Sequence, residues 1–257
     1  MALLSLTVEG QPDTIPGSAF AHVLVDSLLI LGDVGKAITR RSASEIVWYL
    51  RDLKISSAAV TLVSRPTEEV GDPILQDISA AYVDGLRIAE TGESLPPYFS
   101  DASLKHLSDM SKPLGREAGA LIARTGNGVH PARVTSQTGR NLKKLRAPSS
   151  RAIGSATGAL DLISLHGKPK FQVYDEVSNR PVTCIFSEGE LDQIKAALSK
   201  RVTVNGTVVR NAKGQPIRIE SPEIRILLDG PLLSRLVGID PGFTGGMTLK
   251  EYMERVG

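Results

Sequence analysis

The sequence contains a single cysteine, Cys184, in 257 residues. One thiol excludes an intrachain disulfide framework and a zinc site built from several cysteines, and it fits a reducing compartment. The glycine-rich stretches GNG at 126–128 and GFTGG at 242–246 lack the Gly-Lys-Ser/Thr ending of a phosphate-binding loop. We therefore interpret both stretches as turns.

The sequence also lacks a long uninterrupted apolar segment. Its longest apolar stretch, residues 20–35, is broken by His22, Asp26 and Asp33. It is shorter than the roughly 20 apolar residues that a membrane span requires. The first 13 residues carry no basic region of the kind that begins a secretory signal. We expect a soluble, cytoplasmic protein with no membrane partner.

No arrangement of residues in the sequence is typical of an active site. His22 and Asp26 lie four residues apart, a spacing that can orient an imidazole or share a metal, but no second ligand pair accompanies them. His106, His130 and His166 are scattered, and no Ser/His/Asp or Cys/His pattern is visible. We therefore expect no catalytic residue, no metal and no cofactor. An enzyme that uses scattered carboxylates of the first half is the least supported alternative.

The length and the 41% hydrophobic content allow two modest domains. In residues 1–147, alternating apolar residues predict strands, and apolar residues at three- and four-residue steps predict helices. Asp72 is the expected N-cap of one helix that ends by Gly92, and Ser100 the N-cap of another. The expected strands cover 3–10, 45–55, 58–64, 118–125 and 129–135, and the expected helices begin near 18, 72, 100 and 137. Together they predict an α/β layered domain.

The pattern changes after the linker at 147–151. Strands are expected at 152–166, 170–176, 181–186, 201–211 and 216–228. Gly154 and Gly158 allow the first strand to bend. Ser187 and Glu190 form the S-x-x-E pattern of a capping box, which predicts one helix between the third and fourth strands. This order resembles the OB-fold, a five-stranded Greek-key barrel, over residues 150–228.

The complete prediction is an α+β fold. The layered domain at 1–147 is followed by the OB-like barrel at 150–228 and by a short helical tail at 229–257. The apolar content of the tail predicts that it docks on its own domain or on a partner protein.

The resemblance to the OB-fold also implies a binding face. In that family, single-stranded nucleic acid or oligosaccharide commonly lies across the second and third strands, here residues 170–186. Strand alternation points Phe171 and Val173 inward, and Lys170, Gln172 and Tyr174 outward. The same alternation points Val182, Cys184 and Phe186 inward, and in the strand at 201–211 it points Val202, Val204 and Val208 inward. Tyr174 would then stack against a base; the alternative is a tyrosine on a solvated strand face.

The distribution of charge is more informative than the net charge of +2. Between Glu117 and Asp161 there is no acidic residue. The seven bases in this segment are Arg124, Arg133, Arg140, Lys143, Lys144, Arg146 and Arg151. Arg140, Lys143 and Lys144 share one helical face and could neutralise phosphates, with a salt-dependent affinity as the consequence. The alternative is a solvated face that acids from elsewhere in the fold balance.

The sequence thus predicts a non-enzymatic nucleic-acid-binding or accessory protein that favours single strands. The expected contact residues are Arg140, Lys143, Lys144, Arg146, Arg151, Lys170 and Tyr174. The alternative function is an interaction or scaffold subunit of a bacterial complex, with the tail as the surface that binds a partner protein.

Overall fold

The computed structural model describes residues 1–227 except 12–13, 40–45, 55–57, 117 and 127–129. Its described part is a mixed α+β structure with two five-stranded sheets and five α-helices. Residues Met1–Ile226 form one compact unit. The predicted tail at 229–257 lies outside the described residues.

The first sheet has the strand order β2-β3-β1-β4-β5, and its pairs are antiparallel. Its strands are β1 (Ala2–Val8), β2 (Trp48–Lys54), β3 (Ala59–Ser64), β4 (Leu121–Thr125) and β5 (Ala132–Val134). The predicted hairpin β2–β3 is present, and β5 lies at an edge, where the preceding Pro131 is tolerated. Every second residue of β1 is buried, which is the pattern of a strand with one face on the core.

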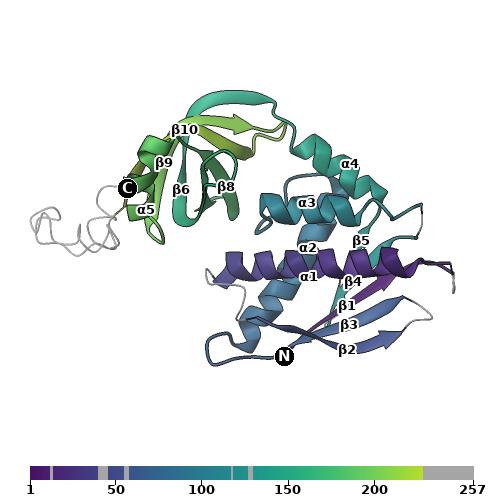
Figure 1. Ribbon diagram of the computed structural model, residues 1–257. Helices are drawn as coiled ribbons and strands as arrows, with labels where there is room; N and C mark the ends of the chain where they lie inside the picture. Colours follow the sequence, from purple (N-terminus) through teal and green to yellow (C-terminus); the bar gives the residue numbers. More distant parts are fainter. Residues whose placement is uncertain (12–13, 40–45, 55–57, 117, 127–129, 228–257) are drawn as a thin grey trace, which may run out of the picture. The chain divides into compact units, whose positions relative to one another are not determined.

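Four helices pack with this sheet around one hydrophobic core (Figure 1). They are α1 (Gly17–Thr39), α2 (Asp72–Thr91), α3 (Asp101–Met110) and α4 (Ser136–Leu145). The N-cap of α2 is Gly71, and Asp72 is the first helical residue, so the expected cap was one residue too late. Gly92 ends α2 with φ 70°, a left-handed conformation that glycine adopts readily. Ser100 caps α3 as expected, because its side chain accepts a hydrogen bond from the Ser103 amide.

By length and composition alone, helix α1 is apolar enough to cross a membrane. Core helices of soluble proteins and signal sequences pass the same test. Several of its apolar residues, among them Val23, Ile30, Leu31 and Val34, are fully buried in the core of the first sheet. This packing is compatible with a soluble protein.

The second sheet closes into a barrel with the strand order β10-β8-β7-β6-β9. Its strands are β6 (Ser150–Ser164), β7 (Lys170–Asp175), β8 (Arg180–Ile185), β9 (Arg201–Arg210) and β10 (Pro216–Ile226). Strands β8 and β10 pair in parallel, and the other neighbours are antiparallel. The helix α5 (Leu191–Ala196) lies between β8 and β9, where the sequence placed it.

The predicted capping box of α5 is half formed. The Ser187 amide donates to Glu190 Oε2 at 2.7 Å. A 3₁₀ turn, Glu188–Glu190, comes first, and α5 starts at Leu191 without a side-chain cap. The S-x-x-E pattern therefore located the helix but not its first residue.

Strand β6 pairs with two different strands of the barrel, and its pairing partner changes from β9 to β7 near Gly158. Up to Ala159 it pairs with β9, and from Gly158 onward it pairs with β7. A Cβ atom at Gly158 would lie 1.7 Å from the Tyr174 carbonyl oxygen. Only a residue without a side chain allows the two backbones to approach this closely.

The core of the barrel contains the inward residues that strand alternation predicted, together with residues of β6, β10 and α5. It includes Phe171, Val173, Val182, Cys184, Phe186, Val202, Val204 and Val208. The rings of Phe171 and Phe186 lie 5.9 Å apart in a tilted arrangement, which is favourable for aromatic pairs.

Cys184 gives a first test of this core. Its side chain is fully buried, and burial raises the pKa of its thiol well above the usual range. Because the thiolate is the reactive form, we expect Cys184 to react with Ellman's reagent orders of magnitude more slowly in the native protein than in denaturant. Equal rates in the two conditions would place Cys184 on the outside and reverse the assignment of the β8 faces.

Candidate nucleic-acid interface

Helix α4 presents the basic residues that the sequence grouped. Its buried residues are Thr138, Leu142 and Leu145. Arg140, Lys143 and Lys144 are exposed on the other side, and Arg146 is the exposed C-cap. No ion pair within the described part of the chain involves any of these four cations. The alternative interpretation, that acidic residues from elsewhere in the fold balance this face, is therefore not supported by the described part of the chain.

A carboxylate from α2 fixes the other end of α4. Glu90 accepts hydrogen bonds from the Thr135 amide at 3.1 Å and the Thr135 hydroxyl at 2.6 Å, and also from the Thr138 hydroxyl. The acid therefore lies at the N-terminus of α4, while Lys143 and Lys144 occupy its last turn. Both placements complement the helix dipole and leave the cations free for another partner.

A buried arginine, which the sequence did not single out, lies near the end of α4. Arg180 begins β8, is only 3% exposed, and its Nε atom has no hydrogen-bond partner. The pKa of Arg180 is lowered to about 10, chiefly because the guanidinium is buried; Asp101 opposes this shift and Arg146 adds to it. Arg180 therefore remains a cation at neutral pH, and it lies close enough to Arg146 for their charges to interact.

Arg151 belongs to a charged group on the outside of the barrel. Arg218 Nε donates to Glu220 Oε1 at 2.8 Å, and Arg151 Nη2 lies 3.7 Å from the same oxygen. The hydrogen bond from Arg218, followed by the charges of Arg151, Arg218 and Lys168, holds the pKa of Glu220 below its usual range. Three cations thus surround one carboxylate, and the group has an excess of positive charge. Arg151, unlike the α4 cations, already has an acidic neighbour.

The ribbon β7–β8 is less open than the sequence suggested. Lys170, Gln172 and Tyr174 are all half-buried. Burial, followed by the negative charges of Asp161 and Asp33, raises the pKa of the Tyr174 hydroxyl well above its usual range. Strand alternation correctly excluded Tyr174 from the barrel core, but the ring is not on a fully solvated face.

Contacts with the layered half explain this partial burial. Thr183, which lies opposite Gln172 in the ladder, donates a hydrogen bond to Asp101 Oδ2 of α3 at 3.1 Å. The Tyr98 amide donates to the Asn179 carbonyl at 2.7 Å in the turn between β7 and β8. One end of the ribbon is therefore occupied by protein contacts.

A second polar cluster appears only in three dimensions. Asp26 Oδ1 lies 2.8 Å from His106 Nδ1, and Asp26 Oδ2 lies 3.2 Å from His22 Nε2. The spacing of His22 and Asp26 was visible in the sequence, but His106 is 80 residues from Asp26 and joins it only because α1 and α3 pack together. No group of three or more histidine, cysteine or acidic residues suited to a metal ion occurs in the described part of the chain.

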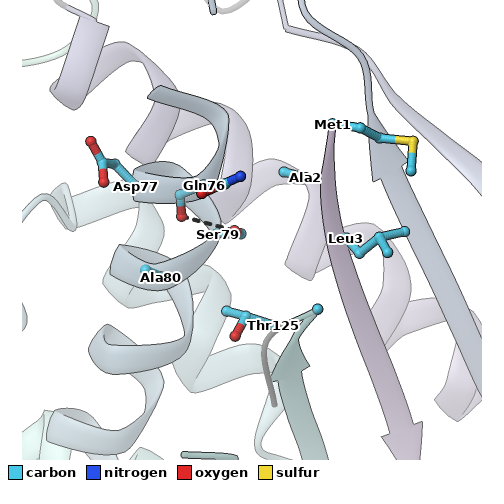
Figure 2. Close-up of a pocket in the computed structure, with 9 residues that line it drawn as sticks. Met1, Ala2, Leu3, Gln76, Asp77, Ser79, Ala80 and Thr125 are labelled. Carbon is cyan, nitrogen blue, oxygen red and sulfur yellow. Dashed lines mark hydrogen bonds between the residues drawn. The ribbon is translucent and has the colours of Figure 1, made fainter. Parts of the chain in front are cut away.

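A hollow of about 340 Å³ lies between the start of β1, the end of β4 and helix α2, and Figure 2 shows residues that line it. Gln76, Asp77, Ser79 and Thr125 supply its polar side chains. The Ser79 hydroxyl donates to the Gln76 carbonyl oxygen at 2.9 Å, and no histidine or cysteine lines the hollow. These lining residues do not form a nucleophile with an adjacent base.

The comparisons with known proteins add no family to this description. No model of a known protein family matches the chain, and no curated protein matches it.

Proposed function

We propose that the protein is a non-enzymatic, cytoplasmic nucleic-acid-binding protein that favours single strands, and that its barrel is an OB-fold. The closed five-stranded barrel and the helix between its third and fourth strands support the fold assignment. The contact residues are Arg140, Lys143, Lys144 and Arg146 of the α4 region, together with Arg180. Arg151, Lys170 and Tyr174 extend this surface along the outside of the barrel.

The observation that carries the proposal is the buried side chain of Arg180, whose Nε atom has no hydrogen-bond partner and which forms no ion pair with any described residue. An isolated charge is costly to bury, and buried arginines are normally paired. A phosphate group would add a negative charge to that of Asp101, which acts on Arg180 without forming an ion pair, and would accept hydrogen bonds from the guanidinium. Arg146 is near enough to contact the same or the neighbouring phosphate.

The α4 cations continue this surface. Because they have no acidic partner among the described residues, their charge is available to a polyanion. Phosphate neutralisation by such a group releases counterions, which supplies much of the binding free energy. Tyr174 adds at most one stacked base, because its ring is half-buried.

Replacing Arg180 by methionine separates function from stability. Removal of a buried charge that forms no ion pair with a described residue should leave the free energy of unfolding unchanged or raise it, because an apolar side chain of similar length fits such a site at least as well. The affinity for a fluorescent single-stranded oligonucleotide should fall about tenfold or more, since a charge-assisted hydrogen bond is lost. Chemical denaturation and fluorescence anisotropy measure the two effects.

Arg225→Met is the matched control, because Arg225 is an exposed barrel arginine that already pairs with Glu223 at 3.3 Å. It should change neither quantity measurably. If Arg180→Met bound the oligonucleotide as tightly as the unmodified protein, Arg180 would have no role in ligand binding.

A specific feature favours the alternative function, an interaction or scaffold subunit. Strand β2 is an edge strand, and its Tyr49, Leu50 and Leu53 are each about half exposed. Exposed apolar residues on an unpaired edge are typical of a surface that binds another chain. Under this alternative, a partner protein binds β2 or the tail at 229–257. Changing Leu50 and Leu53 to lysine should release a partner that binds β2, and deleting residues 247–257 should release one that binds the tail.

A further inference from the structure

A second hollow lies between the first turns of α1 and the end of α3, with a volume of about 570 Å³. Its lining residues are Ser18, Ala19, His22, Asp109, Lys112, Pro113 and Arg116. Three of the side chains are basic or can be protonated, and one is acidic. The hollow therefore favours a negatively charged ligand.

Two backbone hydrogen bonds lie at Arg116 and at its neighbour Gly115. The Arg116 amide donates to the Pro113 carbonyl at 3.3 Å, and the Gly115 amide donates to the Ala118 carbonyl at 2.6 Å. Gly115 has φ 83°, a conformation that suits glycine and closes the turn. Arg116 is exposed and has no ion pair with any residue that the structure describes. Arg116 lines the hollow, and its guanidinium is available to a ligand.

Lys112 lies one turn before this loop. Its Nζ atom donates to Asp109 Oδ1 at 2.6 Å. This hydrogen bond, with smaller contributions from the charges of Lys112, Lys105 and His22, holds the pKa of Asp109 below its usual range against the opposing effect of burial. Among the residues that line the hollow, the two cations Lys112 and Arg116 thus outnumber the one carboxylate, Asp109.

The third side chain that can be protonated, His22, contacts the buried residue Asp26. Asp26 is 6% exposed, and its Oδ2 atom accepts no hydrogen bond although it lies 3.2 Å from His22 Nε2. His22 Nε2 therefore faces this buried carboxylate oxygen, and the contact orients the imidazole ring. The His22 side chain is 51% exposed, so its other face is open to solvent at the hollow.

We propose that this hollow binds a phosphate group, either as inorganic phosphate or as a small phosphomonoester. Arg116 contacts two phosphate oxygens, and Lys112 and His22 each contact one. Asp26 is a positioning residue that holds His22, and His106 holds Asp26 from the other side through the 2.8 Å contact. The site is built from α1 and α3 and uses none of the residues assigned to the nucleic-acid surface.

Isothermal titration of the full chain with inorganic phosphate, and separately with a nucleoside 5′-monophosphate, tests this site. Ionic strength is held constant with sodium chloride. The unmodified protein should bind one phosphate per chain, and Arg116→Gln and His22→Gln should each weaken binding about tenfold. Tighter binding of the monophosphate would identify a phosphomonoester as the ligand, and equal affinities would identify phosphate itself. Lys36→Gln, which removes an exposed cation from the other end of α1, should bind phosphate as the unmodified protein does.

Asp26→Asn tests the positioning role. This substitution should weaken phosphate binding when His22 is present, but should have no further effect in the His22→Gln variant. If Asp26 had only a structural role, Asp26→Asn would weaken binding equally in both proteins. The proposal is overturned if the unmodified protein binds no phosphate at millimolar concentration, or if Arg116→Gln and His22→Gln bind as well as Lys36→Gln. A protein with Lys143, Lys144 and Arg146 changed to glutamate should retain phosphate binding, so this site and the nucleic-acid surface can fail independently.

Discussion

Changing Lys143, Lys144 and Arg146 together to glutamate is expected to abolish the binding of single-stranded nucleic acid at about 0.15 M salt. The three residues lie in the last turn and at the C-cap of α4, and no acid within the described residues pairs with them. Each lost phosphate contact lowers the slope of log affinity against log salt by roughly one, and three new carboxylates repel the strand as well. Electrophoretic mobility shift or fluorescence anisotropy measures the loss.

The control for this variant makes the same change in net charge elsewhere. Lys36, Lys54 and Lys105 are exposed residues of the layered half and are outside the proposed surface. Their change to glutamate should weaken binding only through the long-range field, which about 0.15 M salt screens beyond roughly 8 Å. Equal losses in the two triple variants would show that net charge, rather than the α4 surface, determines binding.

The α4 variant should remain folded, because its three side chains are on the exposed face of the helix. Acidic residues at a helix C-terminus are unfavourable by about 0.3–1 kcal/mol each, so a modest decrease in the free energy of unfolding is expected. Circular dichroism and chemical denaturation verify that lost binding is not lost structure.

Gly158→Ala is expected to have the largest effect of any single substitution on the stability of the barrel. The new Cβ atom would lie 1.7 Å from the Tyr174 carbonyl oxygen and 2.6 Å from its carbon, both of them backbone atoms that no side-chain rotation can move. Strands β6 and β7 would have to separate where β6 leaves β9. We expect the free energy of unfolding to fall by about 3 kcal/mol or more.

Two other glycines of the barrel calibrate this prediction. At Gly154 the nearest atom to an added Cβ is a Val208 methyl carbon at 3.1 Å, and at Gly189 there is nothing within 4 Å. Gly154→Ala should therefore be mildly destabilising, and Gly189→Ala should fall within about 0.5 kcal/mol of the unmodified protein. If Gly158→Ala were as stable as Gly189→Ala, the barrel could not be closed at β6 as described.

The local patterns of the sequence predicted the elements well, because each depends on nearby residues. Alternation alone placed Val182, Cys184 and Phe186 on the inner face of β8, and the structure buries all three. Gly154 and Gly158 were both expected to bend β6, but only the position of the Tyr174 backbone shows that Gly158 is the one without room for a side chain.

The candidate site was predicted only in part, because local patterns do not show which distant residues the fold brings together. The basic face of α4 follows from helical spacing and from a segment without acids. The burial of Arg180 does not, because a charged residue beside the turn at Ser178 and Asn179 looks solvent-exposed in the sequence; its environment depends on Asp101 and Arg146 of the layered half. The meeting of His106 with Asp26 depends in the same way on packing between distant helices.

The most direct test of the central claim is the affinity of the unmodified full chain for a labelled single strand as a function of salt. DNA and RNA single strands of about 20 nucleotides, and the matching duplex, are titrated between about 0.05 and 0.3 M sodium chloride. With Arg140, Lys143, Lys144, Arg146 and Arg180 on phosphates, log affinity should fall against log salt with a slope of roughly −3.5, and a single strand should bind more tightly than the duplex. No measurable binding of any nucleic acid at the lowest salt would contradict the account and favour the scaffold function.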